Sequence, residues 1–367
     1  MIRVSLYVRS GNSAAVTFYR FYQYLTQIDS VEVSYHTMIP EQIYRRYMPI
    51  SGSSVAVRIF VVLLSQFRVS LSLLRDFVVP PSVLIISRKL TDRFSPIYYF
   101  WILRSLRRRG VKIIWDFDDN IIDSREISRS NFDRLSELSH TIVVASPHLY
   151  TLIQSRYLTE TIYLPTTDGT LYGQHNSSVD YLREQSLDKE LRIIWVGTSV
   201  SLAYLEPLAQ MLEVLAQRSV ARGRRVTFTV VCNHPLLYRA RGYTLRNVVW
   251  TREVAATELL NAHIGVMPLE NSEFNRGKGG FKLIQYLSVG LPVVVSAVGI
   301  NRDIVTRGEG YCINRLDSTR WIDALEEITS TPSRWREYSR SAKATWLERF
   351  SFERGVERWR RLILECS

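Results

Sequence analysis

Short apolar runs of strand length alternate with helical patterns along most of this chain, and the alternation occurs twice. A strand followed by a helix and another strand is the pattern of a parallel sheet whose helices cover its faces. A polar stretch without strong periodicity, 165–189, separates the two series. We therefore predict an α/β fold of two Rossmann-like, doubly wound domains that face a cleft.

The first series contains five apolar runs that predict strands, at 2–7, 31–36, 83–87, 112–115 and 141–145. Helical patterns at 15–27, 97–109 and 131–138 lie between them. Ser13 is the expected N-cap of the first helix, and Ser146 is expected to cap a helix that Pro147 opens.

The second series begins with a strand at 191–196 and a helix at 202–217. Further strands are predicted at 226–231, 248–250, 264–267 and 292–296, and the stretch 319–364 is mostly helical. A length of 367 residues fits two domains of ordinary size. The predicted boundaries are domain 1–165, linker 166–190 and domain 191–345, followed by a C-terminal helix, 346–367, that packs back on the first domain.

The balance of charge is basic, with 47 Lys and Arg against 35 Asp and Glu and a formal net charge of +12. Such a balance either aids solubility alone or indicates an acidic partner, namely a small phosphate ligand, an anionic membrane face or nucleic acid. Three cysteines without metal-like spacing argue against a disulfide scaffold or zinc site and favour a reducing cytosol. The first seven residues predict a strand and not a signal peptide.

The apolar stretch 55–74 carries Arg58 and Arg68, which makes it a poor membrane-spanning segment. It predicts a long amphipathic helix that packs internally or lies on a membrane surface. A run of arginines, Arg104, Arg107, Arg108 and Arg109, ends the helix at 97–109. These cations suit a helix C-terminus, or they form a basic face toward lipid headgroups.

Several familiar nucleotide and hydrolase motifs are absent from the sequence. It contains no G-x-x-x-x-G-K-[ST], no G-x-G-x-x-G after a strand, no H-E-x-x-H and no G-x-S-x-G. P-loop nucleotidases, classical dinucleotide enzymes, zincins and α/β-hydrolases are therefore disfavoured.

The stretch 274–299 carries the strongest indication of chemistry. Three glycines precede or open a helix that runs to about Ser288, and Gly290 and Pro292 end it. Helix N-termini attract anions, and glycines let a phosphate approach the backbone closely. Lys278, Lys282 and Gln285 follow at i, i+4 and i+7, which predicts one shared helix face. The stretch is either a diphosphate site or a surface loop with solvated lysines. The glycines are Gly277, Gly279 and Gly280.

The segment 268–301 resembles the C-terminal signature of the group 1 glycosyltransferases, the GT4-like clan of the GT-B fold. The clan's block K-L-x-E-x-x-x-x-G-x-P-V-V-x-S-x-x-G corresponds here to Lys282 through Gly299. The segment 264–269 is similar to the strand that precedes this block, and 195–199 with 204–206 to the start of the clan's C-terminal domain. The resemblance implies an acceptor-side domain followed by a nucleotide-sugar-binding domain.

Two positions depart from the pattern of the clan. Many members place two glutamates eight residues apart, and the second usually holds the ribose. Here these positions are Gly277 and Gln285. A glutamine amide both donates and accepts, so Gln285 is still expected to hydrogen-bond a ribose hydroxyl. The departure affects the identity of the donor more than the fold.

The resemblance assigns roles to residues at the ends of strands and at the lysine helix. Lys278 and Lys282 are expected to neutralise the leaving diphosphate, with Gly197, Thr198 and Ser199 as further phosphate contacts. Arg252 and Glu253 lie near the base or cap a helix, and Gly11 and Asn12 reach the donor or acceptor. Asp116 and Asp118 serve as base or hydrogen-bond acceptor on the acceptor side, or belong to a loop that caps a helix.

These assignments predict an enzyme that moves a sugar from a UDP- or GDP-sugar to an acceptor hydroxyl, with retention and without a metal. The acceptor is a glycan or a lipid-linked molecule in the assembly of cell-surface polysaccharide or glycolipid. We expect no cofactor beyond the donor, no nucleic-acid partner, and a cytoplasmic location, including the inner face of the membrane. The alternatives are a nucleotide-sugar epimerase of the same fold and a non-catalytic basic protein that binds nucleic acid or membranes.

Overall fold

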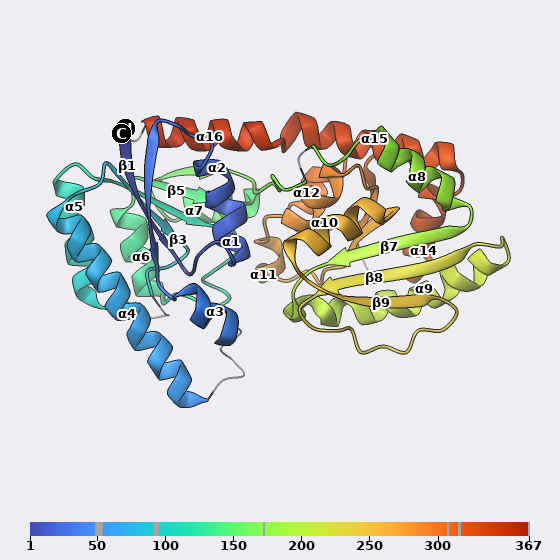
Figure 1. Ribbon diagram of the computed structural model, residues 1–367, viewed down its shortest axis with the longest axis horizontal. Helices are drawn as coiled ribbons and strands as arrows, with labels where there is room; N and C mark the ends of the chain where they lie inside the picture. Colours follow the sequence, from blue (N-terminus) through green and yellow to red (C-terminus); the bar gives the residue numbers. More distant parts are fainter. Residues whose placement is uncertain (48–53, 92–94, 172, 307, 315–316, 366–367) are drawn as a thin grey trace. The chain divides into compact units, whose positions relative to one another are not determined.

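The structure is a computed structural model and describes residues 1–47, 54–91, 95–171, 173–306, 308–314 and 317–365 (Figure 1). The chain divides into two compact units. Unit 1 comprises Met1–Thr166, Gly277–Gly279 and Glu353–Ser367, and unit 2 comprises Thr167–Arg276 and Gly280–Phe352. Each unit is therefore assembled from segments that are far apart in the sequence.

The sheet of unit 1 has six parallel strands in the order β2-β1-β3-β4-β5-β6. The direction of winding reverses between β1 and β3, and doubly wound sheets bind ligands outside the carboxyl ends of the strands at such a point. The five predicted strands are present, and the sixth, β6, lacks a clear apolar run. The strands are β1 Ile2–Val8, β2 Val31–Thr37, β3 Val83–Ser87, β4 Lys112–Phe117, β5 Thr141–Val144 and β6 Glu160–Tyr163.

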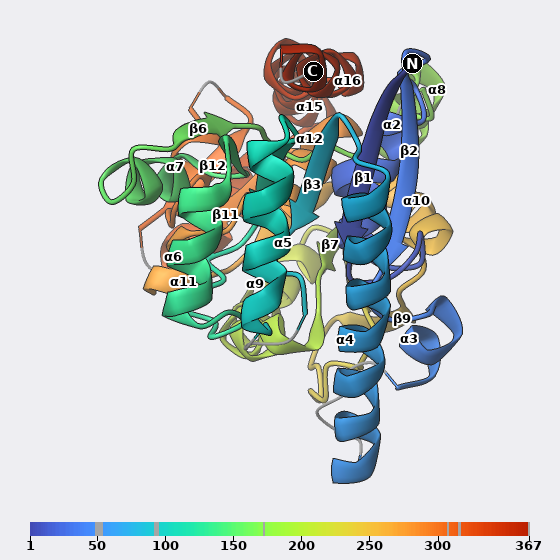
Figure 2. The same cartoon turned by 90° about the vertical axis from the view of Figure 1, so that its left-hand side faces the viewer.

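The helices of unit 1 bury one apolar stripe each, and Figure 2 shows α4, α5 and α6 along one face of its sheet. Ser146 caps α7 as predicted, because its Oγ accepts the Leu149 N–H at 3.3 Å. The predicted cap Ser13 is wrong, since α1 follows Ala14 and has no side-chain cap. The helical segments are α1 Ala15–Thr17, the π-helical η1 Phe18–Tyr22, α2 Gln23–Leu25, α3 Glu41–Tyr47, α4 Val55–Val78, α5 Ile97–Arg108, α6 Arg129–Leu138, α7 Pro147–Gln154 and α16 Phe352–Glu365.

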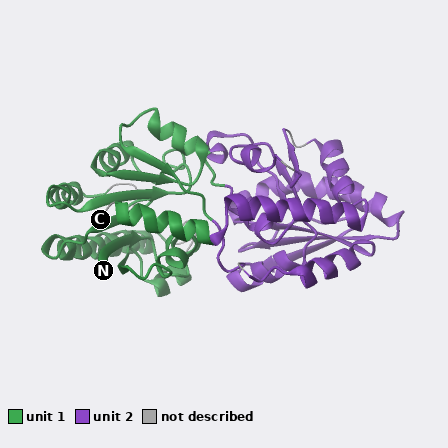
Figure 3. Cartoon of the chain, turned by 90° about the horizontal axis from the view of Figure 1, so that it is seen from above, with its two compact units in different colours: residues 1–166, 277–279, 353–367 green, residues 167–276, 280–352 purple. Residues whose placement is uncertain are grey.

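The C-terminal helix α16 packs against the N-terminal helical segments of unit 1 (Figure 3). The ring of Trp359, which is fully buried, lies 5.4 Å from that of Phe21. A Cβ atom at Gly355 would lie 2.5 Å from Cε1 of Tyr24, so the absence of a side chain permits this close approach. The last helix of the sequence thus completes the core around the first.

The sheet of unit 2 also has six parallel strands, in the order β12-β11-β10-β7-β8-β9. Counted from β7, this is the order of a Rossmann fold, with its reversal between β7 and β10. The predicted pair of doubly wound α/β domains is therefore confirmed. The strands are β7 Glu190–Val196, β8 Arg225–Cys232, β9 Thr244–Val249, β10 Ile264–Met267, β11 Val293–Ser296 and β12 Gly310–Ile313.

The helices of unit 2 include one inside the stretch that we predicted as a linker. In α8, the buried Arg183 donates to the carbonyl oxygens of Leu259, Leu260 and Val289, which anchors the helix to the unit. The polar composition of this stretch concealed a structural role. The helices are α8 Ser177–Leu187, the 3-10 helix η3 Ser199–Tyr204, α9 Leu205–Val220, α10 Arg252–Asn261, α11 Glu273–Arg276, α12 Phe281–Ser288, α13 Asn301–Ile304, α14 Ser318–Ile328 and α15 Pro332–Arg349.

Candidate functional site

The loop after β7 lies at the point where the winding of the unit 2 sheet reverses. Gly197, Thr198 and Ser199 follow the strand directly, as predicted, and Thr198 is exposed. A Cβ atom at Gly197 would lie 2.2 Å from the Trp195 ring, so packing requires this glycine. The backbone N–H of Ser199 already donates to Oδ1 of Asn233 at 3.2 Å. The hydroxyl of Thr198 is thus the most accessible polar group of this turn.

Helix α12 begins at Phe281, because Gly280 adopts a left-handed conformation with φ of +67°. No side chain caps its N-terminus, so its first amides point outward without a side-chain acceptor. Lys282 and Gln285 lie on this helix, but Lys278 precedes it and belongs to unit 1. The predicted helix face shared by Lys278, Lys282 and Gln285 is therefore wrong.

A buried chain of polar groups connects Lys282 to Asp168. Nζ of Lys282 donates to Oε1 of Gln285 at 3.5 Å, and Nε2 of Gln285 donates to Oδ2 of Asp168 at 2.5 Å. Oδ1 of Asp168 accepts from the N–H and hydroxyl of Thr170 at 2.8 and 2.6 Å. Asp168 and Gln285 are buried, with 1% and 2% of their surfaces exposed, whereas Lys282 is partly exposed.

The position of Gln285 differs from the expected ribose contact. Both ends of its amide face protein groups, and its side chain is buried. Its role in this structure is to hold Lys282 and Asp168 in place. Burial lowers the pKa of the Lys282 ammonium to about 8, and the negative charge of Asp168 opposes this decrease. Lys282 is therefore mostly protonated at neutral pH and has an accessible charge.

Asp168 is the functional candidate that the sequence analysis missed. It lies 117 residues before Gln285, inside the polar stretch assigned to a linker. Only an Asp-Gly pair marks the position in the sequence, and such pairs are typical of turns. Its contact with Gln285 could be found only from the fold.

The glycines before α12 fit closely against unit 1. A Cβ atom at Gly277 would lie 2.8 Å from Cβ of Asn120, and one at Gly279 would lie 2.8 Å from Cβ of Ala145. The carbonyl oxygen of Gly277 accepts the Ser146 hydroxyl at 3.0 Å. These two glycines are thus required by packing against protein, which the phosphate interpretation did not anticipate.

Lys278 lies between these glycines and faces the carboxylate of Asp119. Burial lowers the pKa of the Lys278 ammonium, and Asp119 opposes that shift. Burial also raises the pKa of Asp119, and Lys278 is among the cations that oppose this rise. Lys278 is therefore tied electrostatically to the loop after β4.

Asp116 is a structural residue, contrary to its predicted role as a base. Strand β4 continues to Phe117, so Asp116 lies within the sheet and is 1% exposed. Nε of Arg20 donates to its two oxygens at 2.6 and 2.7 Å. Burial raises the pKa of Asp116 to about 6 while Arg20 opposes the rise, so the buried pair is ionised at neutral pH.

Asp118 lies just after β4 and keeps a partly exposed carboxylate. It is 3.4 Å from Nη1 of Arg88, whose guanidinium also pairs with Asp119 at 3.1 Å and Glu126 at 3.0 Å. Arg88 follows β3 in a left-handed conformation with φ of +61°. Asp118 thus remains a candidate at the carboxyl edge of unit 1, held by an arginine that the sequence analysis did not select.

The two remaining predicted sites lie at strand and helix ends. Gly11 and Asn12 follow β1 at the reversal point of unit 1, and a Cβ atom at Gly11 would lie 2.8 Å from Oε2 of Glu41. Arg252 and Glu253 open α10, where Thr251 accepts the Val254 N–H at 3.1 Å. Hydrogen bonds from its own backbone and from Thr251 lower the pKa of Glu253. This arrangement is a capped helix N-terminus, as the alternative interpretation proposed.

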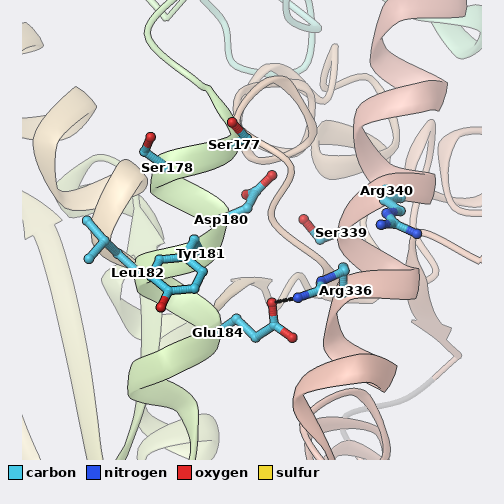
Figure 4. A pocket seen from close by; sticks show the side chains of 9 residues that line it. All are labelled: Ser177, Ser178, Asp180, Tyr181, Leu182, Glu184, Arg336, Ser339 and Arg340. Atoms are coloured by element: carbon cyan, nitrogen blue, oxygen red, sulfur yellow. Dashed lines mark hydrogen bonds and ion pairs between the residues drawn. The ribbon is translucent and has the colours of Figure 1, made fainter.

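A hollow of about 690 Å³ lies between α8 and α15 (Figure 4). Its polar lining includes Asp180, Ser339 and Arg340, and Arg336 pairs with Glu184 across it. None of the predicted site residues lines this hollow. Among the described residues, no group of three or more His, Cys, Asp or Glu is placed to hold a metal ion.

Comparison with known proteins supports the resemblance that the sequence indicated. Residues 190–331 match the family model described as Glycosyl transferases group 1. This segment contains the loop after β7 and the whole of α12. A search of curated proteins finds no match.

Solved structures share the fold at low sequence identity. HepE (Alr3699) of Anabaena, in complex with UDP-glucose, has a TM-score of 0.64 and 11% identity, and the match covers 100% of this chain and 99% of that one. TarM of S. aureus, in complex with fondaparinux, α-GlcNAc-glycerol and UDP, has a TM-score of 0.54 and 11% identity over 81% of this chain. The match spans only 59% of the TarM chain.

An epimerase structure also shares the fold. The putative UDP-N-acetylglucosamine 2-epimerase of Listeria monocytogenes has a TM-score of 0.55 and 10% identity, with 93% of this chain and 91% of that chain covered. The two Rossmann-like units therefore have the GT-B architecture, and the resemblance to group 1 glycosyltransferases is confirmed. The family match in unit 2 assigns the chain as a glycosyltransferase.

Proposed function

We propose that the chain transfers a sugar from a UDP- or GDP-sugar to a hydroxyl of a glycan or lipid-linked acceptor, with retention of anomeric configuration. The family match over residues 190–331 supports transfer of a sugar, and the UDP-glucose complex of HepE supports a nucleotide-sugar donor. Assembly of cell-surface polysaccharide or glycolipid is the process in which we place the reaction.

The observation that carries this proposal is the Lys282 ammonium on the first turn of an uncapped helix. Outward-pointing amides and the helix dipole favour an anion at the N-terminus of α12. A partly buried ammonium attracts a phosphate more strongly than a solvated one does, because less solvent screens the charge. Both features lie in the unit that matches the family model.

In the proposed reaction, the bond between the anomeric carbon and the β-phosphate oxygen breaks, and its electron pair passes to that oxygen. The acceptor oxygen bonds to the anomeric carbon on the same face, and its proton passes to the departing diphosphate. Lys282 and the α12 amides stabilise the negative charge that develops on the leaving group. No covalent intermediate with the enzyme is required, which agrees with the buried, paired state of Asp116.

We also propose that this fixed positive charge replaces a metal ion. Turnover should then persist in EDTA and should not rise when Mg²⁺ or Mn²⁺ is added. A strict requirement for either ion would contradict this part of the proposal.

The donor site is tested by calorimetric titration with UDP, GDP and their sugars, using Lys282→Ala. Loss of one charged contact to a phosphate should weaken nucleotide binding by about tenfold to a hundredfold. Lys343→Ala is the matched control, because burial also lowers the pKa of Lys343 to about 8. Lys343 donates instead to the carbonyl oxygen of Ser288, at the last residue of α12. Equal affinity of Lys282→Ala and wild type would overturn the assignment.

Epimerisation of the donor is the second candidate, and the shared fold with the Listeria protein favours it. An epimerase would convert a nucleotide sugar to its isomer in the absence of any acceptor. A transferase would release free nucleoside diphosphate in proportion to transferred sugar when acceptor is present. Chromatography of the products with and without acceptor separates the two reactions.

We propose a cytoplasmic location at the inner face of a membrane. The net charge of +12 and the apolar exterior of α4 support this location. Fractionation of cells that express the tagged chain would test it, and recovery only in the soluble fraction would oppose it.

A further inference from the structure

Helix α4 is unusual because it is apolar on two opposite sides. Val61, Ser65, Val69 and Leu73 recur every four residues and are buried in unit 1. A second stripe follows the spacing of three and four residues on the opposite side of the helix. It consists of Phe60, Leu63, Phe67, Leu71, Leu74 and Val78, and each is more than half exposed, from 52% to 75%.

Helix α5 extends this apolar surface and then ends in positive charge. It lies beside α4, since the hydroxyl of Ser70 is 2.8 Å from that of Tyr98 and Tyr99 donates to the carbonyl oxygen of Gln66 (Figure 2). Trp101 is 63% exposed on its outer side. The exposed Arg104 and Arg108 follow at the spacing of three and four residues that keeps them on the same side.

The basic end of α5 is open to an anion. Arg104, Arg107 and Arg108 line a hollow of about 430 Å³ together with Glu137 and Leu138. Arg109 packs over the Phe77 ring at 5.3 Å, so the arginine cluster meets the C-terminal part of α4. Three arginines against one glutamate leave the hollow with a net positive charge.

We propose that the outer stripe of α4, with Trp101 and the arginines of α5, docks unit 1 onto a bilayer that contains anionic phospholipid. An aromatic and aliphatic stripe that enters the interface, with cations beside it for the lipid phosphates, is the composition of an in-plane membrane helix. This inference deepens the proposed membrane location by naming the surface and the lipid, and it does not depend on sugar transfer.

The structure favours this arrangement over a helix that spans the membrane. Within the described residues, α4 is the one helix long and apolar enough to cross a bilayer. Its inner side is nevertheless fixed to unit 1, because Asp76 accepts from Ser5 and Tyr7 at 2.9 and 2.6 Å. Arg68 also donates to Thr37 at 2.8 Å. Spanning would break these buried contacts, whereas docking of the outer stripe leaves them intact.

The experiment is flotation of the full chain with vesicles of pure phosphatidylcholine and with vesicles that contain roughly one-third phosphatidylglycerol. We expect the bound-to-free ratio to be about tenfold higher with the anionic vesicles and to fall as salt is raised. Arg104→Gln with Arg108→Gln should remove the preference for anionic lipid. Leu63→Gln with Phe67→Gln and Leu71→Gln should lower binding to both kinds of vesicle by about tenfold or more.

The matched control replaces three exposed apolar residues elsewhere, Leu158, Val220 and Val249, by Gln, and it should bind as wild type does. Circular dichroism establishes that each variant is folded. Equal binding by the stripe variant and this control would overturn the proposal. Two other results would also overturn it: association of wild type into dimers through the stripe without vesicle binding, and resistance of bound protein to alkaline carbonate.

Discussion

Lys282 is the residue on which the proposed chemistry depends, and its charge is sensitive to pH. Its pKa of about 8 means that the ammonium is present below pH 8 and is lost as the pH rises through that value. We expect the affinity for UDP to fall above about pH 8 and protons to be taken up on binding near that pH. Titration calorimetry between about pH 6 and pH 10 measures both effects.

Lys282→Arg provides the control for this pH dependence. A guanidinium remains protonated throughout this range, so the decline above pH 8 should disappear even if the affinity at pH 7 changes. A decline that persists unchanged in this variant would show that another group titrates.

Asp168 makes a separate prediction, because it is the counter-charge that keeps the pKa of Lys282 from falling further. Asp168→Asn preserves the size of the side chain but removes its charge. The decline in UDP affinity should therefore begin at a lower pH than in wild type. Asp180→Asn is the comparison, since Asp180 is the carboxylate near Lys343 and should not affect the profile. If Asp168→Asn lowers stability and leaves the profile unchanged, the role of Asp168 is structural only.

At the scale of elements, the loop that precedes α12 is shaped by its contact with unit 1. Gly279→Ala would place a Cβ atom 2.8 Å from Cβ of Ala145, in a backbone conformation that alanine tolerates. We expect the free energy of unfolding to fall by about 1–3 kcal/mol. Ala145→Gly in the same chain should restore part of this loss, since the Ala145 carbonyl oxygen remains 3.1 Å away. Additive effects of the two changes in denaturant unfolding would refute this explanation.

The sequence predicted most elements but not how far each one extends, and the errors at the site follow from that. Helical periodicity placed Lys278 on α12, whereas the left-handed Gly280 starts that helix at Phe281. The apolar run of β4 ended at Trp115 in the prediction, but the strand includes Asp116 because the buried Arg20 neutralises its charge. A charge that is paired inside the fold is indistinguishable in the sequence from one that faces a substrate. The glycine turn after β7 was located correctly because it depends only on local signals.

At the scale of the whole molecule, each unit has a core of its own, and the two cores should respond to different perturbations. Trp359 of α16 is buried in unit 1, so Trp359→Ala should lower the stability of that unit by about 3–5 kcal/mol. Trp101→Ala removes the same kind of side chain from an exposed position of unit 1 and should have a much smaller effect. UDP, bound at α12, should instead stabilise unit 2.

Hydrogen exchange measured peptide by peptide distinguishes these responses. Trp359→Ala should reduce protection in β1 through β6 and leave β7 through β12 unchanged, and saturating UDP should protect the second group of strands in wild type and variant alike. This separation is expected because the strands of one sheet exchange cooperatively with their own core. Loss of protection in both sheets to the same extent would mean that the chain unfolds as one cooperative body, with α16 contributing to the stability of the whole.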